Sequence, residues 1–248
     1  MEKNSFIHIF QKGFNYSQDG PGNRLVYHLA GCNLKCPWCS NPEGMELTKA
    51  ATTLNIDDIL KEVLSCKMLF IDGGGVTLTG GEVTCQRDGV IKLLNTLKQS
   101  NIHTCIETNA SLKGCEEIFD CVDYMIADFK SPDGDLLKAV TGADIEIIKQ
   151  NLLYRAKTGK PLLVRIPLIN GFNCGAKNAI LFCDFFNQLQ ATGNQNLFFE
   201  ILTYHEFGKE KYEKNGKTYQ YKNGFVSTED VKILADEIKK NNLKLIHT

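Results

Sequence analysis

The chain lacks any apolar run long enough to cross a bilayer, and its first ten residues have neither a basic start nor the apolar core of a secretory signal. It also lacks a block rich in Lys or Arg, and its formal net charge is −1. Nucleic acids attract proteins through clustered positive charge, so the sequence predicts no nucleic-acid partner. We therefore expect a cytoplasmic protein that binds neither membranes nor nucleic acid.

No low-complexity linker divides the 248 residues, so we expect one domain over 1–248, acting as a monomer. Apolar, β-branched runs alternate with helical patterns, as in repeated βα units. This alternation predicts an α/β fold with a parallel sheet, arranged as a partial (β/α)6 TIM-like barrel. The predicted strands are 24–30, 75–79, 102–107, 123–128, 162–167 and 196–202, and the predicted helices are 55–64, 89–99, 112–119, 144–158, 176–189 and 227–241.

Three of the ten cysteines, Cys32, Cys36 and Cys39, are separated by three and then two residues. A loop this tight can turn three thiolates toward one metal centre, whereas a disulfide would leave the third thiol idle. An iron–sulfur cube held by three cysteines keeps one iron open to an exogenous ligand, as a catalytic zinc keeps an open position. The spacing therefore predicts a reactive [4Fe–4S] cluster.

Two other interpretations use the same three residues. A Cys3His zinc site also begins with closely spaced cysteines, although the next His downstream is His103. Ordinary buried thiols are the third interpretation. The seven other cysteines show no second ligand spacing, and we expect most of them to be small buried hydrophobic residues. They are Cys66, Cys85, Cys105, Cys115, Cys121, Cys174 and Cys183.

Gly80-Gly81-Glu82 follows the predicted strand 75–79. A triphosphate-binding loop nearly fits from Gly75, but Gly81 and Glu82 stand where that loop requires Lys and Ser or Thr. Two glycines let the main chain approach a ligand, and an adjacent carboxylate can pair with an ammonium group. The segment is therefore a candidate site for a ligand with an amino group.

Other candidates stand at the ends of predicted strands, where the βα loops of a parallel barrel surround one cavity. Arg165 lies within an apolar strand, where an unpaired charge would be costly, so a buried ion pair is its simplest alternative role. For the rest, loop caps and satisfied structural residues are the alternatives. These candidates are Glu107, Thr108, Asp128, Lys130 and His205.

Taken together, these segments resemble the radical S-adenosylmethionine (radical SAM) superfamily, whose Cys-x3-Cys-x2-Cys loop matches Cys32, Cys36 and Cys39. Residues 19–24 (Asp-Gly-Pro-Gly-Asn-Arg) and 38–43 (Trp-Cys-Ser-Asn-Pro-Glu) resemble more closely the enzymes that activate glycyl radical enzymes, in particular those of the pyruvate formate-lyase type. The similarity extends through most of the chain.

This resemblance implies an anaerobic oxidoreductase that reductively cleaves S-adenosylmethionine and removes a hydrogen from one glycine of a partner glycyl radical enzyme. It also implies a flavodoxin- or ferredoxin-like electron donor and a monovalent cation beside the methionine carboxylate. Residues 41–65 contain no cysteine, so we expect one cluster and no ferredoxin-like insertion. A radical SAM enzyme acting on a small molecule and a zinc-binding interaction module remain alternatives.

By the same resemblance, Asp19 is the catalytic candidate, beside the reacting 5′ carbon and the incoming glycine loop. Glu82 receives the amino group of S-adenosylmethionine, although Val83 replaces the family's proline. Glu107, where the family has Asp, would hold the cation together with Thr108 and Asp128. The residues expected to bind cofactors are Trp38, Gly80, Gly81, Glu82, Glu107, Thr108, Asp128, Lys130, Arg165 and His205.

Overall fold

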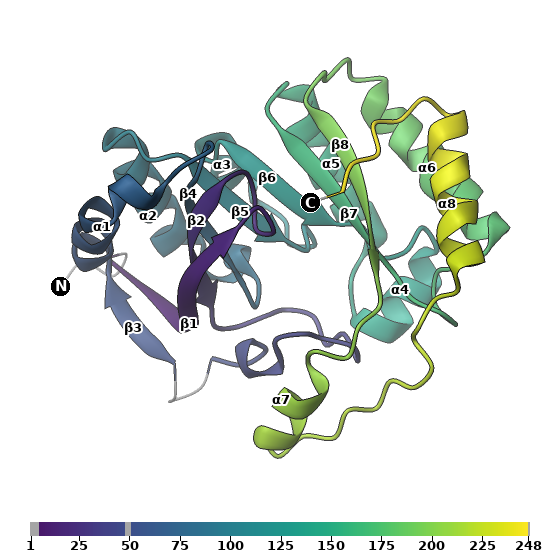
Figure 1. Cartoon of the computed structure of the whole chain (residues 1–248), viewed down its shortest axis with the longest axis horizontal. Helices are drawn as coiled ribbons and strands as arrows, with labels where there is room; N and C mark the ends of the chain where they lie inside the picture. Colours follow the sequence, from purple (N-terminus) through teal and green to yellow (C-terminus); the bar gives the residue numbers. More distant parts are fainter. Residues whose placement is uncertain (1–4, 48–50, 248) are drawn as a thin grey trace. The chain divides into compact units, whose positions relative to one another are not determined.

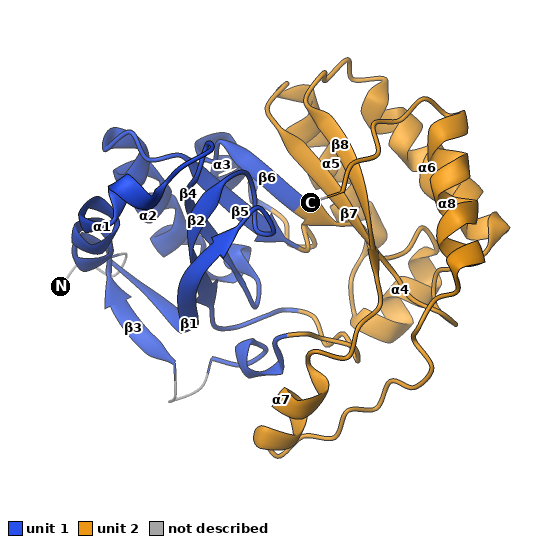
Figure 2. Ribbon diagram, viewed as in Figure 1, with its two compact units in different colours: residues 1–33, 41–108, 114–126 blue, residues 34–40, 109–113, 127–248 orange. Residues whose placement is uncertain are grey.

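A computed structural model describes residues 5–47 and 51–247. The chain separates into two compact units (Figure 2). Unit 1 comprises the described parts of 1–33, 41–108 and 114–126, and unit 2 comprises those of 34–40, 109–113 and 127–248. The cysteine loop therefore begins in unit 1 and continues in unit 2.

Both units alternate strands and helices along the chain (Figure 1). Unit 1 contains β1 (Phe6–Tyr16), β2 (Asn23–Leu29), β3 (Thr52–Asn55), α1 (Ile56–Ser65), β4 (Gly75–Gly80), α2 (Arg87–Gln99), β5 (Thr104–Thr108) and α3 (Glu116–Cys121). Unit 2 contains α4 (Gly134–Thr141), α5 (Ile145–Lys157), β7 (Leu162–Leu168), α6 (Ala176–Gln190), β8 (Leu197–Thr203), α7 (Lys209–Lys214) and α8 (Thr228–Lys240). The strand β6 (Tyr124–Asp128) begins in unit 1 and ends in unit 2.

The sheet of unit 1 has the strand order β3-β1-β2-β4-β5-β6. β1 is antiparallel to both β2 and β3, whereas β2, β4 and β5 run parallel. In unit 2, β7 and β8 pair in parallel along their whole lengths. The predicted α/β class and mostly parallel strands are therefore confirmed, with an antiparallel addition at the N-terminal end of the chain.

Capping residues explain where two of the predicted helices begin. The Asn55 side chain accepts a hydrogen bond of 2.8 Å from the Asp57 N–H and so caps α1. At α8, Ser227 and Asp230 form a reciprocal capping box. Both helices begin within a residue of their predicted starts because these caps are local sequence signals.

Five elements differ from the prediction, and β3 and α7 are two that were not predicted. β1 was not predicted, because its second half is mostly exposed and polar and forms a strand only by pairing with β2. α4 was also missed, although Asp133 caps its start and Gly142, at φ +86°, ends it. The helix expected over 112–119 begins only at Glu116, since Asn151 of α5 donates to the carbonyls of Ala110 and Leu112 and holds that segment as a loop.

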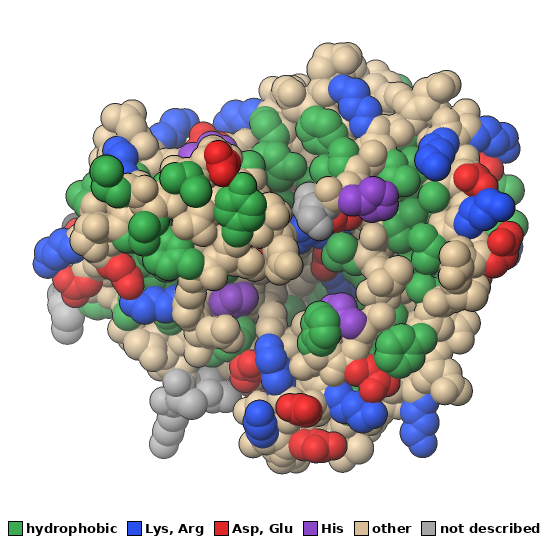
Figure 3. Space-filling view, viewed as in Figure 1, with side chains coloured by type: hydrophobic (Ala, Val, Ile, Leu, Met, Phe, Trp, Pro, Cys, Tyr) green, Lys and Arg blue, Asp and Glu red, His purple; other side chains and the backbone are tan. Residues whose placement is uncertain are grey.

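A cluster of phenylalanines forms much of the core of unit 2. Phe186 stacks on Phe199 of β8 with ring centroids 4.4 Å apart, and Phe129 packs on Phe185 at 4.8 Å. No helix among the described residues is long and apolar enough to span a membrane. On the face shown in Figure 3, basic and acidic side chains lie among one another rather than in areas of one sign.

Candidate functional site

The first part of the cysteine loop is fixed to unit 1 by its main chain. The loop leaves β2 through Gly31, whose φ of +94° lies in the region that favours glycine. The Gly31 N–H donates to the Gly44 carbonyl at 2.9 Å, and the Cys32 N–H donates to the Met45 carbonyl at 3.1 Å. Cys32 is therefore held just beyond the C-terminal end of a parallel strand, as predicted.

The second part of the loop belongs to unit 2. The Lys35 N–H donates to the Thr141 carbonyl at 3.2 Å, and the Cys39 N–H donates to the Cys36 carbonyl at 3.2 Å, which closes a tight turn. Trp38 is largely buried, with its ring 4.6 Å from that of Phe172. The Trp38 side chain thus packs in an aromatic core and fixes the turn between the last two cysteines.

The Gly80-Gly81-Glu82 segment lies against the start of the cysteine loop. The Gly81 N–H donates to the Leu29 carbonyl at 2.7 Å, and the Glu82 N–H donates to the Gly31 carbonyl at 2.8 Å. A Cβ at Gly81 would lie 2.2 Å from the Gly31 oxygen, so only glycine fits. This glycine is therefore required by the main chain that leads into the cysteine loop, while the approach to a ligand stays a prediction.

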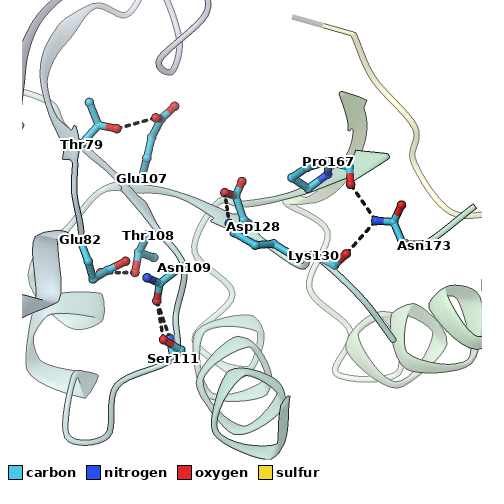
Figure 4. Close-up of polar contacts among 10 residues, drawn as sticks. All are labelled: Thr79, Glu82, Glu107, Thr108, Asn109, Ser111, Asp128, Lys130, Pro167 and Asn173. Carbon is cyan, nitrogen blue, oxygen red and sulfur yellow. Dashed lines mark hydrogen bonds and ion pairs between the residues drawn. The ribbon is translucent and has the colours of Figure 1, made fainter. Parts of the chain in front are cut away.

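Glu82 is buried at the end of β4 and caps the short 3₁₀ helix Val83–Gln86. One carboxylate oxygen, Oε1, accepts hydrogen bonds from the Thr84 N–H at 3.0 Å, the Thr84 hydroxyl at 2.7 Å and the Thr108 hydroxyl at 2.6 Å. The contact with Thr108 joins two of the predicted site residues (Figure 4). The structure therefore fixes the orientation of this carboxylate.

Glu107 and Thr108 are consecutive residues at the end of β5. Successive side chains of a strand point to opposite faces of the sheet, and these two follow the rule. Glu107 accepts a hydrogen bond of 2.7 Å from the Thr79 hydroxyl, whereas Thr108 binds Glu82 (Figure 4). The two side chains therefore have different partners, and the cation that they were expected to share stays a prediction.

Asp128 is the last residue of β6 and Lys130 stands two residues later, both in unit 2. They form an ion pair with an N–O distance of 2.5 Å, and Lys130 is mostly buried. The buried Asn173 amide donates to the carbonyls of Lys130 and Pro167, each at 2.7 Å, and so ties the ends of β6 and β7 together (Figure 4). Asn173 was not predicted, because an Asn in a loop carries no distinctive pattern.

Arg165 has a buried carboxylate partner. It stands opposite Glu200 in the parallel register of β7 and β8, and its Nε lies 2.7 Å from Glu200 Oε2. Pairing of this kind removes most of the cost of burying either charge alone. The ion pair weighed as the alternative role of Arg165 is therefore present, and Glu200 is the partner that sequence reasoning did not name.

Asp19 lies in the turn that precedes β2. Its carboxylate accepts a hydrogen bond from the Asn15 amide, and its carbonyl accepts one of 2.7 Å from the Thr77 hydroxyl. Thr77 stands opposite Val26 in the parallel register of β4 and β2, and a Cβ at Gly20 would lie 3.0 Å from the Cys105 sulfur. The turn therefore folds back so that Asp19 lies beside the middle of these strands.

The Arg24 side chain supports the turn that contains Asp19 through hydrogen bonds. Its guanidinium is fully buried and donates to the Thr77 hydroxyl at 2.6 Å, the Pro21 carbonyl at 3.0 Å and the Val76 carbonyl at 2.7 Å. Burial lowers the pKa of Arg24, but carbonyl and hydroxyl oxygens satisfy the charged group. In the sequence, Arg24 stood out only as the last residue of the motif at 19–24. Its burial and its hydrogen bonds give it a structural role.

His205 follows β8 and stacks on Phe207 with ring centroids 4.2 Å apart. Burial lowers the pKa of His205, and the nearby positive charge of Lys211 lowers it further. The imidazole is therefore neutral at physiological pH, and can offer a donor, an acceptor and an apolar face.

Comparison with known proteins identifies the family. A model described as the radical SAM superfamily matches residues 26–177. The chain is 32% identical over 241 residues to a pyruvate formate-lyase-activating enzyme of Streptococcus mutans, covering 94% of this chain and 88% of that protein. The enzyme of the same name from Staphylococcus aureus is 30% identical over 234 residues, covering 90% and 88%. The chain belongs to the radical SAM superfamily, and within it to the pyruvate formate-lyase-activating enzyme family.

Solved structures agree with this radical SAM fold. A domain of a pyruvate-formate lyase-activating enzyme from Bacteroides vulgatus matches with a TM-score of 0.56 and 24% identity, covering 70% of this chain and 98% of that one. Streptococcus suis SuiB bound to the precursor peptide SuiA matches with a TM-score of 0.65 and 20% identity, covering 89% and 46%. Membership of this superfamily makes the chain an enzyme and implies a [4Fe–4S] cluster and S-adenosylmethionine.

The cysteine loop fits the implied cluster by the chemistry of its donors. Cys32, Cys36 and Cys39 form no disulfide within the described residues, and the turns around them are fixed by main-chain hydrogen bonds. Among residues 5–47 and 51–247, no three His, Cys, Asp or Glu side chains gather closely enough for a single metal ion. A cube takes one cysteine on each of several irons, so its ligands are spread around the cluster.

Proposed function

We propose that this protein activates a glycyl radical enzyme by removing a hydrogen from the α-carbon of one of its glycines. The observation that carries the proposal is the similarity to two pyruvate formate-lyase-activating enzymes along nearly the whole chain. Pyruvate formate-lyase, or a relative of it, is the partner that this similarity favours. The Asp19–Arg24 segment supports the proposal, because its motif is typical of activating enzymes.

The cluster would be held by Cys32, Cys36 and Cys39, and together with S-adenosylmethionine it supplies one-electron reductive cleavage of a carbon–sulfur bond. The chain's own residues would bind and orient S-adenosylmethionine. Glu82 receives the ammonium group of S-adenosylmethionine, and its three hydrogen bonds fix the carboxylate before the ligand arrives. The neutral His205 contacts the adenosine part.

The remaining candidates complete the cofactor pocket in this proposal. Glu107, Thr108 and Asp128 would bind the monovalent cation beside the methionine carboxylate, as the resemblance to the activating enzymes implies. Lys130 forms an ion pair with Asp128, and Arg165 forms one with Glu200. Each of the two basic side chains would therefore line the pocket with its charge already paired. Trp38 serves by fixing the turn between Cys36 and Cys39.

Asp19 meets the glycine loop of the partner in this proposal. Its main chain is held beside the middle of β4 by the Thr77 hydroxyl, and its carboxylate would guide the segment that carries the target glycine. Residues 1–248 act as one radical SAM domain, a cytoplasmic monomer without a ferredoxin-like insertion. Its electrons come from a flavodoxin- or ferredoxin-like donor.

The test is an anaerobic reaction of the reconstituted protein with S-adenosylmethionine, a reductant and pyruvate formate-lyase. We expect 5′-deoxyadenosine together with the doublet of a glycyl radical by electron paramagnetic resonance. A partner whose target glycine is replaced by alanine is the matched control and should give no doublet. Release of 5′-deoxyadenosine without a radical on any glycyl radical enzyme tested would favour a small-molecule substrate instead.

A further inference from the structure

Residues 204–221 of unit 2, which we call the anchor segment, contact the main chain of the cysteine loop at two points. The Tyr212 hydroxyl donates a hydrogen bond of 3.3 Å to the Cys36 carbonyl. Gly208 packs so closely on the Cys39 carbonyl that a Cβ at this position would lie 2.1 Å from its oxygen. One segment therefore touches the backbone of two of the three predicted cluster ligands.

The two residues that make these contacts, Tyr212 and Gly208, are also bonded to each other. The Tyr212 N–H donates to the Gly208 carbonyl at 2.9 Å through the turn that begins α7. The ring of Tyr212 meets that of Tyr219 edge-on at 5.2 Å, and the Tyr219 hydroxyl shares a hydrogen bond of 2.6 Å with that of Tyr204. Tyr212 cannot shift alone, because hydrogen bonds and ring contacts hold it to the rest of the anchor segment.

A third contact is made by side chains alone. The Trp38 ring, between the two cysteines in sequence, meets the Tyr221 ring edge-on at 5.2 Å. Tyr221 in turn packs against Tyr204 with ring centroids 5.9 Å apart. Aromatic contacts of this kind contribute beyond the area they bury, so they fix the turn that presents Cys36 and Cys39.

The Tyr212 hydroxyl is suited to a donor role. The side chain of Tyr212 is largely buried, and its hydroxyl lies 3.3 Å from the Cys36 carbonyl oxygen. A buried carbonyl that lost this donor would bear an uncompensated desolvation cost.

We propose that Tyr212 and Gly208 are positioning residues that set where Cys36 and Cys39 present their sulfurs to the cluster. Iron retention and reduction potential both depend on the orientation of the ligands and on the hydrogen bonds around the cluster sulfurs. The anchor segment thereby tunes the cluster without touching it. This inference rests on the cluster assignment within the proposed function, and it does not depend on which partner is activated.

The first experiment replaces Tyr212 by phenylalanine, which keeps the ring and removes the hydroxyl. After anaerobic reconstitution, we expect Tyr212→Phe to release iron to a chelator roughly fivefold faster than the wild type, as loss of one buried hydrogen bond would allow. We also expect its cluster midpoint potential to shift. The control is Tyr27→Phe, which removes a hydroxyl bonded to Glu62 at 2.7 Å and should change neither quantity.

The second experiment replaces Gly208 by alanine, so that the new methyl group displaces the Cys39 carbonyl. We expect bound iron to fall roughly twofold or more, since no flexible side chain can yield at this contact. Gly13→Ala is the matched control, because a Cβ at Gly13 meets nothing within 4 Å. Circular dichroism of the iron-free proteins shows whether each variant still folds.

The proposal is overturned if Tyr212→Phe matches the wild type in both iron release and midpoint potential, whatever Gly208→Ala does. Neither measurement involves a partner protein. A wild-type protein that loads its cluster but forms no glycyl radical would therefore contradict the proposed function and leave this inference standing.

Discussion

Asp19 is held by its neighbours on both its carboxylate and its carbonyl side, by Asn15 and by Thr77. A substitution that keeps its size should therefore leave the turn intact and change only its charge. We expect Asp19→Asn to lose about tenfold or more in glycyl radical yield, the scale on which one positioned charge contributes to a reaction. Uncoupled cleavage of S-adenosylmethionine should change much less, because Asp19 is proposed to meet the partner's glycine loop and not to hold the cofactor.

Both quantities can be measured in one reaction, the radical by electron paramagnetic resonance and the cleavage by chromatography of 5′-deoxyadenosine. Gln18→Glu, one residue away, is a control for charge near the turn. Equal losses of radical and of cleavage in Asp19→Asn would place Asp19 in the cofactor pocket. An unchanged radical yield would reduce the segment to an ordinary turn.

His103 gives the stability of unit 1 a dependence on pH. Burial lowers the pKa of His103 and the adjacent Arg24 guanidinium lowers it further, while Asp123 opposes them. The folded protein therefore binds fewer protons here than the unfolded chain, whose imidazole has a pKa of about 6.5. The contribution of His103 to the free energy of unfolding is therefore complete at a pH above the unfolded-state pKa, and it is lost as the pH falls below that pKa.

We expect urea unfolding to show a free energy that declines as the pH falls below about 6.5, and a smaller decline in His103→Gln. The imidazole should titrate below its usual range in an NMR experiment. Because Arg24 contacts His103 Nδ1 at 3.3 Å, that nitrogen is the acceptor in the neutral ring. A measured pKa at or above 6.5 would contradict this account.

Among the elements, α8 depends on the cap at its start. The Ser227 hydroxyl accepts the Asp230 N–H at 3.1 Å and donates to the Asp230 carboxylate at 2.6 Å. Ser227→Ala should therefore lower the free energy of unfolding by about 1 kcal/mol, measured by denaturant titration. Thr228→Ala, an exposed change on the next residue, is the control and should stay within about 0.5 kcal/mol of the wild type.

The same cap shows why α1 and α8 were easier to predict than β1. A cap and an apolar stripe act over a few residues, so Asn55 and Ser227 identify α1 and α8 without any knowledge of the rest of the chain. β1 has no such local code, since its hydrogen bonds go to β2 and β3 and its second half is mostly exposed. Its existence follows from pairing, which is a long-range contact.

For the whole molecule, the count of clusters is the sharpest expectation. Only the loop of Cys32, Cys36 and Cys39 has the spacing of cluster ligands, and the other cysteines are scattered. Anaerobic reconstitution should accordingly saturate at about four irons per chain, the content of one [4Fe–4S] cluster. Cys36→Ala should lose most of this iron, while Cys115→Ala, at a buried thiol outside the loop, should keep it.

Iron and sulfide analysis of homogeneous protein checks this expectation. A content near eight irons per chain, with spin coupling between reduced clusters, would mean that scattered cysteines hold a second cube. Electrons would then travel through an internal relay. With one cluster, the donor protein must dock close to the cysteine loop.

The sequence by itself was enough to predict the candidate site of this protein. The spacing of the three loop cysteines, the glycine pair before Glu82 and most helix caps each depend on a few neighbouring residues. Only the tertiary structure decided which partners hold those residues. Glu200 meets Arg165 and Thr108 meets Glu82 across strands, and Tyr212 reaches Cys36 across 176 positions. Such contacts depend on strand register and on the path of the chain in space, and no local pattern of residue types encodes either.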